Sequence, residues 1–156
     1  MWVFVSVFVQ RKDYIMNVCV ELEEGAVMPE KAHEYDAAFD CYTAEEIKVE
    51  PGQTVAVSLG FRLALPMHYE AQIRPRSGLS LKSSIDVVLG TVDSNYRGVV
   101  KAIVRNRNLD VPFWIDKHMR ICQMVIQELP VVRLTQVAAV DTNTERGENG
   151  FGSTSI

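Results

Sequence analysis

The sequence has few cysteine and histidine residues, and those it has are widely spaced. Cys19, Cys41 and Cys122 are odd in number and form neither a disulfide framework nor a C-x-x-C zinc pair. The three histidines are equally scattered and include no H-E-x-x-H motif. These absences argue against a disulfide-stapled scaffold and against zinc held by the protein. They favour a reducing intracellular compartment, either the cytoplasm or the nucleus.

The sequence also lacks a positive net charge and a long hydrophobic run. Its formal net charge is -4, so no overall positive field exists to hold a nucleic-acid polymer. The apolar stretch 2–9 has about half the length that a bilayer span needs. Arg11 and Lys12 follow this stretch, whereas a secretory signal carries its charge in front. We therefore expect neither a nucleic-acid polymer nor a membrane as a partner.

A globular composition with the rhythm of β-strands is present instead. The chain has 156 residues, of which 47% are hydrophobic, as is typical of one domain with a buried core. Runs of β-prone residues recur from residue 16 to residue 137, divided by turns, and the last predicted strand covers residues 131–137. Residues 54–65 alternate with the period of two of a half-buried strand. One short helix is expected to begin at Ser77, whose side chain can cap the first turn. We predict an all-β sandwich or barrel with one short helix.

The chain divides into three segments by composition. Residues 1–15 form an N-terminal extension of unknown role, and residues 16–140 form the β domain. Residues 141–156 are rich in glycine, serine, threonine and asparagine, with Phe151 as their only aromatic residue. This composition predicts a C-terminal arm that is flexible until something docks it.

The segment R-P-R-S-G-L at residues 74–79 could bind an anion. Ser77 would open a helix with free N–H groups, and Gly78 would allow close approach to them. Arg76 could add a guanidinium fork to a phosphate, a geometry that lysine cannot supply. Taken alone, the segment is explained better as a surface turn with salt-bridged arginines.

The segment G-T-V-D-S-N-Y-R-G at residues 90–98 predicts a hairpin with a Ser-Asn tip. The carboxylate of Asp93 at its mouth could accept a proton from water, and Tyr96 could form one wall of a pocket. A turn aspartate that bonds its own backbone explains this segment at least as well when it is taken alone.

The segment R-G-E-N-G-F-G-S-T at residues 146–154 could wrap phosphates with its glycine backbone and hydroxyl groups. Phe151, isolated among glycines, could stack on a flat partner. A disordered tail is an equally good explanation of this segment by itself.

Taken together and in this order, the three segments resemble motifs of the trimeric dUTPase family, the deoxyuridine 5'-triphosphate nucleotidohydrolases. Residues 76–79 match the family motif R-S-[GS]-L, and residues 90–98 match G-x-[IV]-D-x-x-Y-x-G throughout. Residues 146–155 resemble R-G-x-G-G-F-G-S-[TS]-G, with Asn149 and Ser155 in place of glycines. The joint occurrence of these motifs is much more specific than any one of them.

Two further segments complete the set of five family motifs. Residues 37–42 resemble A-G-[FY]-D-L-[YF]: they keep Asp40, with an alanine and Cys41 as departures. Residues 118–124 resemble G-D-R-[IV]-A-Q-[LM]: they keep the arginine and Gln123 but lack the leading Gly-Asp.

The resemblance implies a jelly-roll-like β-barrel of the dUTPase β-clip type and an enzyme, a dUTP diphosphatase. Such an enzyme hydrolyses dUTP to dUMP and pyrophosphate by a magnesium-assisted attack of water on the α-phosphorus. Asp93 would be the general base, Tyr96 would pack against the deoxyribose, and Asp40 would contact Mg²⁺ through water. The resemblance also implies a homotrimer, in which the arm of one subunit closes the active site of a neighbour.

The substrate contacts follow from the same resemblance. Ser77, Gly78 and Gln123 would contact the inner phosphates, while the arm would close over the outer end and stack Phe151 on uracil. The hairpin backbone from Val88 onward would pair with the uracil edge. The residues expected to bind the substrate are Arg76, Ser77, Gly78, Val88, Tyr96, Gln123, Arg146, Phe151, Gly152, Ser153 and Thr154.

Three other functions compete with this interpretation. A dCTP deaminase would share the fold but requires a glutamate after the hairpin, where this sequence has Ile103. A binding module with a decayed site would not need the Asp40, Asp93, Tyr96 and Phe151 that the chain retains. A structural jelly-roll protein without a ligand would explain the strands but not these residues together.

Overall fold

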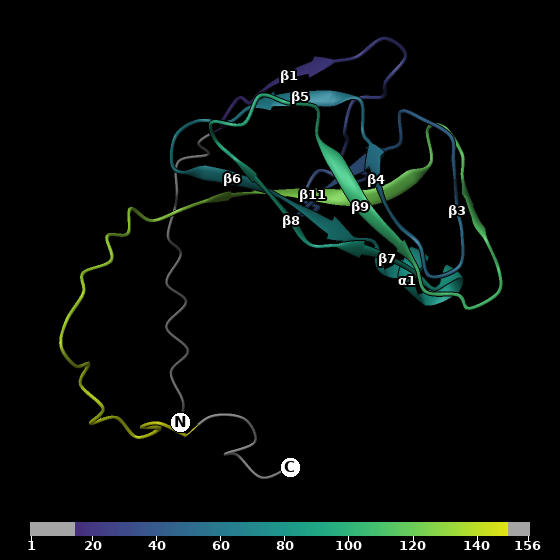
Figure 1. Cartoon of the computed structure of the whole chain (residues 1–156). Helices are drawn as coiled ribbons and strands as arrows, with labels where there is room; N and C mark the ends of the chain where they lie inside the picture. The colour runs from purple at the N-terminus through teal and green to yellow at the C-terminus, as the bar shows by residue number, and fades with distance from the viewer. Residues whose placement is uncertain (1–14, 150–156) are drawn as a thin grey trace, which may run out of the picture.

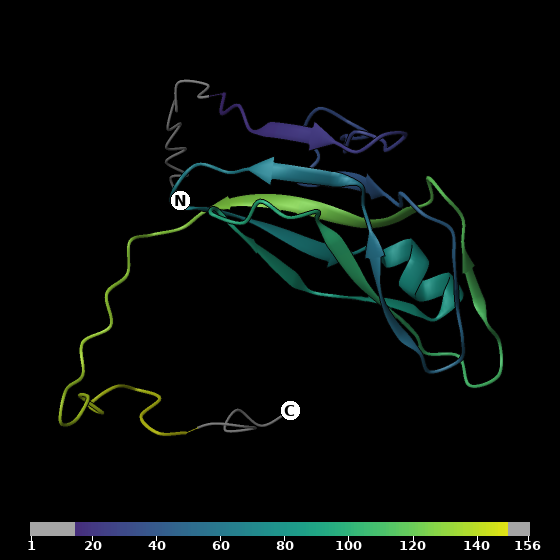
Figure 2. The ribbon, with the colours of Figure 1, turned by 45° about the horizontal axis from the view of Figure 1, so that its top comes forward.

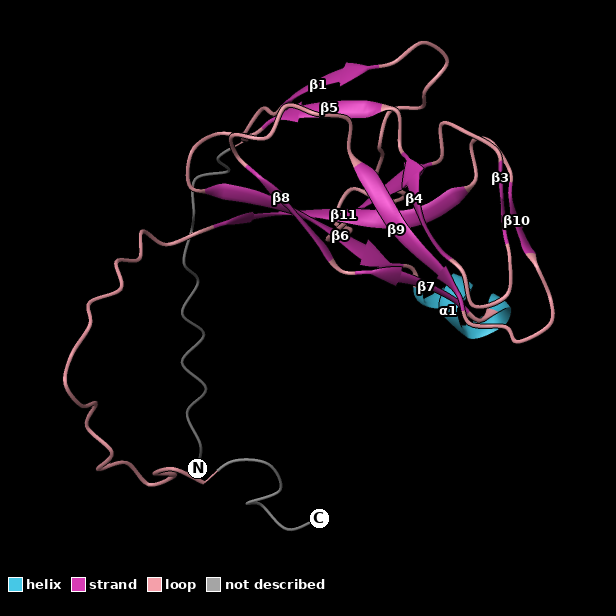
Figure 3. Ribbon diagram, in the orientation of Figure 1, coloured by secondary structure: helices cyan, strands magenta, loops and turns pink. Residues whose placement is uncertain are grey.

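The computed structural model describes residues 15–149, which form a layered β domain followed by an extended segment (Figure 1). Strands dominate this part of the chain, and its single helix lies at one end of the sheets (Figure 3). In chain order the elements are β1 (Cys19–Leu22), β2 (Phe39–Tyr42), β3 (Ile47–Val49), β4 (Thr54–Ser58), β5 (Phe61–Ala64), β6 (Tyr69–Pro75), α1 (Ser77–Ser83), β7 (Ile85–Val88), β8 (Gly90–Asp93), β9 (Lys101–Asn106), β10 (Phe113–Ile115) and β11 (Arg120–Glu128).

Antiparallel pairing joins these strands in four sheets. The largest has the order β2-β11-β6-β8, and a second has the order β4-β9-β7. The remaining strands form the pairs β1-β5 and β10-β3. Figure 2 shows β1 and β5 as a separate layer above the end of the larger sheets. The predicted all-β, jelly-roll-like fold with one short helix is confirmed, although the sheets stay open rather than closed into a barrel.

The core is built from strands whose side chains alternate between buried and exposed positions. In β9 the buried positions are Ala102, Val104 and Asn106, and the residues between them are exposed. The buried amide of Asn106 donates hydrogen bonds to the carbonyl oxygens of Val49 and Val111, at 3.0 and 2.9 Å. Since a buried amide without partners would be destabilising, these bonds fix the loops at this end of the sheet.

The predicted strand over residues 54–65 is split at Gly60 into β4 and β5. Gly60 has a φ of 68°, and a Cβ atom at this position would overlap the Cβ atoms of Ala26 and Ala44. Only glycine combines this backbone conformation with such close neighbours. The apolar side chains ahead of the turn and behind it are buried, as the alternation predicted.

Helix α1 begins at Ser77 as predicted, but the serine does not cap it. The N-cap position belongs to Arg76, whose extended backbone continues β6, and no side chain bonds the first turn. The helix is followed by Ser84 in the left-handed conformation, with a φ of 53°. Nowhere between residues 15 and 149 does a helix have the length and apolar character needed to cross a membrane.

The chain leaves the sheets after β11, and residues 129–149 run away from them as an exposed segment (Figures 1 and 2). The strand predicted over residues 131–137 is absent, because no other strand of the described chain lies beside this stretch to pair with it. Val131 and Leu134 are therefore left 71% and 96% exposed.

Candidate active site

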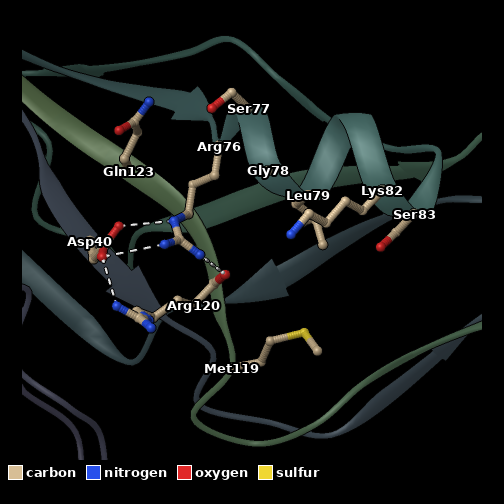
Figure 4. A pocket seen from close by; sticks show the side chains of 10 residues that line it. All are labelled: Asp40, Arg76, Ser77, Gly78, Leu79, Lys82, Ser83, Met119, Arg120 and Gln123. Carbon is tan, nitrogen blue, oxygen red and sulfur yellow. Dashed lines mark hydrogen bonds and ion pairs between the residues drawn. The ribbon is translucent and has the colours of Figure 1, made fainter.

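Asp40 on β2 holds two arginines that come from different parts of the chain. Its Oδ1 atom lies 2.9 Å from Nε of Arg76, and its Oδ2 atom lies 3.4 Å from Nη1 of Arg120 (Figure 4). Arg76 also donates a hydrogen bond of 3.0 Å to the carbonyl oxygen of Arg120. The Asp40 side chain is only 15% exposed, so the carboxylate is shielded, and it pairs with both cations in the absence of a ligand.

Strand pairing explains why these residues meet. β11 pairs with β2 on one side, which sets Gln123 opposite Asp40, and with β6 on the other. β6 ends at Pro75, so the next residue, Arg76, emerges at the same edge. The Gln123 side chain donates a hydrogen bond of 2.9 Å to the Pro75 carbonyl oxygen, which ties β11 to the start of the helix.

A cavity of about 560 Å³ opens at this edge between the helix and β11. Its charged side chains are three cations and one carboxylate, which makes the cavity suitable for a compact polyanion. The residues that line it are Asp40, Arg76, Ser77, Gly78, Leu79, Lys82, Ser83, Met119, Arg120 and Gln123. The structure thus brings together the segments that resemble the first, second and fourth family motifs.

Lys82 is a cavity residue that the sequence analysis did not select. It lies four residues after Gly78, so both residues share one face of α1. This helical spacing from the R-S-G-L segment was the signal that could have identified it. Arg120 was noted only as part of a motif, and its ion pair with Asp40 assigns it to the same site.

Tyr42, two residues after Asp40 on β2, is held by a different hydrogen bond. The Tyr42 hydroxyl group donates to Oε1 of Glu30, and the pKa of Tyr42 is raised, first by this hydrogen bond and then by burial. Glu30 also exchanges two backbone hydrogen bonds with Asp40. These contacts hold β2, an edge strand of four residues, in place beneath the cavity.

The hairpin that carries Asp93 lies elsewhere in the same chain. Asp93 ends β8 and pairs with Glu70 near the start of β6, whereas Arg76 follows the end of β6. Positions 70 and 76 of one extended segment are about 20 Å apart, at about 3.3 Å per residue. Asp93 and Tyr96 therefore do not line the cavity formed by Arg76 in this chain.

The hairpin itself is a well-defined turn with an open carboxylate. The Tyr96 N–H donates a hydrogen bond of 3.0 Å to the Asp93 carbonyl oxygen, and the Tyr96 hydroxyl group donates one of 3.2 Å to Val99. A Cβ atom at Gly98 would overlap the Tyr96 ring, so glycine is required for the ring's position. Within residues 15–149 the Asp93 carboxylate accepts no hydrogen bond, which disfavours its role as a turn residue that bonds its own backbone.

Two further predicted site residues, Val88 and Arg146, do not line the cavity. Val88 is 46% exposed at the end of β7, beside the hairpin. Arg146 lies on the extended segment, where its Nε atom donates a hydrogen bond of 3.0 Å to the Asn149 carbonyl oxygen. Four predicted residues, Phe151, Gly152, Ser153 and Thr154, lie outside the described residues.

Comparison with known proteins identifies the family of the chain. The dUTPase family model matches residues 24–155. A deoxyuridine 5'-triphosphate nucleotidohydrolase of Clostridioides difficile is 40% identical over 136 residues, which cover 86% of this chain and 94% of that protein. The corresponding protein of Clostridium acetobutylicum is 41% identical over 138 residues, covering 87% and 94%.

The solved structure of the Staphylococcus bacteriophage 80alpha dUTPase with dUPNHPP superposes on this fold with a TM-score of 0.85 and 26% identity. The match covers 90% of this chain and 99% of that one. Fold, cavity and motif order therefore define a hydrolase of the jelly-roll class. More specifically, the chain belongs to the dUTPase family.

Proposed function

We propose that the protein hydrolyses dUTP to dUMP and pyrophosphate. The observation that carries the proposal is the cavity in which Arg76, Lys82 and Arg120 converge beside the Asp40 carboxylate. Hydrolysis of a triphosphate is slow because negative charge repels the attacking water, so a site must neutralise the phosphate oxygens and aim the water. The convergent cations suit the first task. Membership of the dUTPase family supports the choice of dUTP.

A homotrimer is the assembly that would complete the site. In one chain the proposed base, Asp93, is about 20 Å from the end of β6, so the cavity needs a hairpin from a second copy. Leu89 next to the hairpin is 62% exposed, as expected for a contact surface between copies. The exposed segment 129–149 would extend to a third copy and carry the arm with it.

Asp93 would be the general base of the reaction. Its carboxylate would accept a proton from a water molecule while the water oxygen bonds to the α-phosphorus. The bond from this phosphorus to the bridging oxygen would break, and pyrophosphate would leave with its charge balanced by cationic groups. Tyr96, held by Gly98 and Val99, would pack against the deoxyribose.

The other contacts would fix the two ends of the substrate. Arg76, Gln123 and the amide groups of Ser77 and Gly78 would hold the inner phosphates at the cavity edge. The hairpin backbone near Val88 would pair with uracil and leave no room for the methyl group of thymine. The arm of a neighbouring subunit would hold the outer phosphates with Arg146, Ser153 and Thr154. The same arm would place Phe151 and Gly152 over the base.

The described residues suit Mg²⁺ only as an ion brought in on the substrate. Between residues 15 and 149 no group of three or more acidic, histidine or cysteine side chains could hold a metal, and Asp40 is already paired with two arginines. Mg²⁺ keeps water ligands and prefers phosphate oxygens, so contact with Asp40 through water is compatible with this arrangement. When bound, the ion would neutralise charge on the phosphate chain and hold it in one conformation.

One assay separates the competing functions. The protein is incubated with Mg²⁺ and each deoxynucleoside triphosphate in turn, and pyrophosphate and ammonia are measured. Pyrophosphate from dUTP alone supports the proposal, ammonia from dCTP would show a deaminase, and neither product would show a binding module. The Asp93→Asn variant is the matched control, because it should bind dUTP with almost no turnover. The bacterial relatives favour the cytoplasm over the nucleus as the place of the reaction.

A further inference from the structure

Two buried cysteines face each other directly beneath the cavity. Cys41 on β2 and Cys122 on β11 are partners in the antiparallel register, and both are fully buried. The pKa of Cys122 is raised well above its ordinary value, first by a hydrogen bond with the Cys41 thiol and then by burial. The register and the burial place both side chains on the same inner face of the sheet.

The backbone geometry of this pair fits a disulfide. On the outer side of β2, the Asp40 N–H donates a hydrogen bond of 2.7 Å to the Glu30 carbonyl oxygen. The Asp40 carbonyl oxygen accepts one of 3.2 Å from the Glu30 N–H. Because backbone groups alternate along a strand, the next residue, Cys41, directs its own toward β11. The register of β11 against β2 shifts between Arg120 and Cys122 and is regular from Cys122 onward, where hydrogen-bonded partners have Cα atoms about 5.5 Å apart. This separation lies inside the range of about 4.4–6.8 Å that disulfides span.

The two cysteines are also paired departures from the family motifs. The first motif has leucine where this chain has Cys41, and the fourth has alanine where this chain has Cys122. A leucine with an alanine and a cysteine with a cysteine can both fill the core at this point, but only the two cysteines can be joined covalently. Two substitutions far apart in sequence thus meet in one contact.

We infer that Cys41 and Cys122 are a redox modification site, at which a reversible disulfide lowers the activity of the adjacent cavity. A disulfide holds its Cβ atoms about 3.8 Å apart, closer than the roughly 4.5–5.5 Å of cross-strand neighbours. Its formation would draw β2 toward β11 where Asp40 lies opposite Gln123. The ion pairs of Asp40 would shift with the strand. This effect on activity rests on the proposed function, whereas the disulfide itself does not.

The reaction is a thiol–disulfide exchange with a low-molecular-weight disulfide as oxidant. The Cys41 thiolate attacks one sulfur of the oxidant and releases one thiol, and the Cys122 thiolate then attacks the Cys41 sulfur and releases the second. Two electrons and two protons leave the protein as the oxidant is reduced to two thiols. Because β2 is an edge strand, its local separation from β11 gives the oxidant access. Burial makes this exchange slow.

The test uses the full-length chain with Cys19→Ser, because Cys19 is the exposed thiol and would react first. The variant is equilibrated with oxidised glutathione under mildly destabilising conditions that open β2, and it is then returned to native buffer. Its intact mass, peptide map and dUTP hydrolysis are measured before and after dithiothreitol. We expect the loss of two hydrogen atoms, a peptide that links residues 41 and 122, and activity that falls about tenfold and recovers on reduction. The matched control, Cys19→Ser with Cys122→Ala, carries the family residue at 122 and should keep its activity.

Two results would overturn the inference. One is a protein in which both thiols remain free after equilibration under mildly destabilising conditions that open β2. The other is a linked protein that hydrolyses dUTP at the rate of the reduced one. If the reduced protein itself released no pyrophosphate from dUTP, the proposed function would fail, and the mass and peptide map would still decide whether the disulfide forms.

Discussion

The Asp40 carboxylate and the Arg76 guanidinium lie 2.9 Å apart at the junction between a sheet and the only helix of the described chain. This ion pair couples the fold to the site, because the carboxylate comes from an edge strand and the arginine from the helix N-cap. Arg76 lines a cavity suited to an anion, and its guanidinium group needs a negatively charged partner when no substrate is present. Asp40 supplies it without filling the cavity.

Replacing Asp40 with asparagine should weaken both the site and the fold. Arg76 and Arg120 would lose their charged partner, and a hydrogen bond to a charged group contributes about 1.5–3 kcal/mol. We expect the free energy of unfolding to fall by about 1–3 kcal/mol in urea titrations, with a higher KM for dUTP. Asp86→Asn is the control, since its ion pair with Arg107 is exposed and should contribute less than about 1 kcal/mol. Equal losses in the two variants would contradict the role of Asp40.

Removal of the Lys82 charge should mainly affect substrate affinity. Its place in the cavity puts an ammonium group near the expected phosphate chain. Lys82→Ala should raise KM about tenfold, equivalent to about 1.4 kcal/mol, with a small change in kcat, and higher salt should reduce the difference. Lys117 is exposed and does not line the cavity, so Lys117→Ala is the matched control. A Lys82→Ala variant with wild-type KM at low salt would exclude this lysine from binding.

Gly98→Ala should reduce activity by displacing the Tyr96 ring, not by unfolding the domain. The added methyl group would occupy the space of the ring, so the tyrosine must rotate away from the position in which we propose that it packs against the sugar. We expect a large loss of kcat/KM with an unchanged circular dichroism spectrum. The double variant with Tyr96→Ala tests the cause, because two changes that act through one side chain are not additive. Fully additive losses would show that Gly98 acts by another route.

Deletion of residues 146–156 should abolish most activity and leave the domain folded. The core strands end with β11 at Glu128, so the deletion removes no strand and no buried side chain among the described residues. The thermal midpoint should stay within a few degrees of the full-length value, while pyrophosphate release from dUTP should be almost lost. Unchanged turnover in the truncated chain would contradict a role for the arm in closing the site.

The sequence predicted the strands more reliably than it predicted how they meet. Alternation located the buried residues around Gly60, but the close approach of Ala26, which leaves no room for a side chain at Gly60, is a contact between distant segments. The strand expected over residues 131–137 is absent because pairing needs a partner strand, and none lies beside this stretch among residues 15–149. The motif residues around Asp40 converge because of strand register, which residue spacing does not encode. The same register separates Asp93 from them.

A mixing experiment tests whether the site is shared between subunits. Asp93→Asn removes the proposed base and Arg76→Ala removes a proposed phosphate ligand, so each pure variant should be almost inactive. If the hairpin and the cavity of one site come from different chains, random trimers from equal amounts of both variants contain about a quarter of sites with both residues intact. Refolding the two variants together should then restore about a quarter of wild-type activity, and mixing them after assembly should restore less.

The same mixture excludes the alternative of a site within one chain. There, every site would carry one of the two substitutions whatever the assembly, and refolding together would restore nothing. The distance from the β8 end to the β6 end predicts restoration, because no rearrangement short of breaking the β6-β8 pairing brings Asp93 to Arg76 in one chain. Activity that stays at the level of the pure variants, in a sample shown by light scattering to contain trimers, would contradict the shared site.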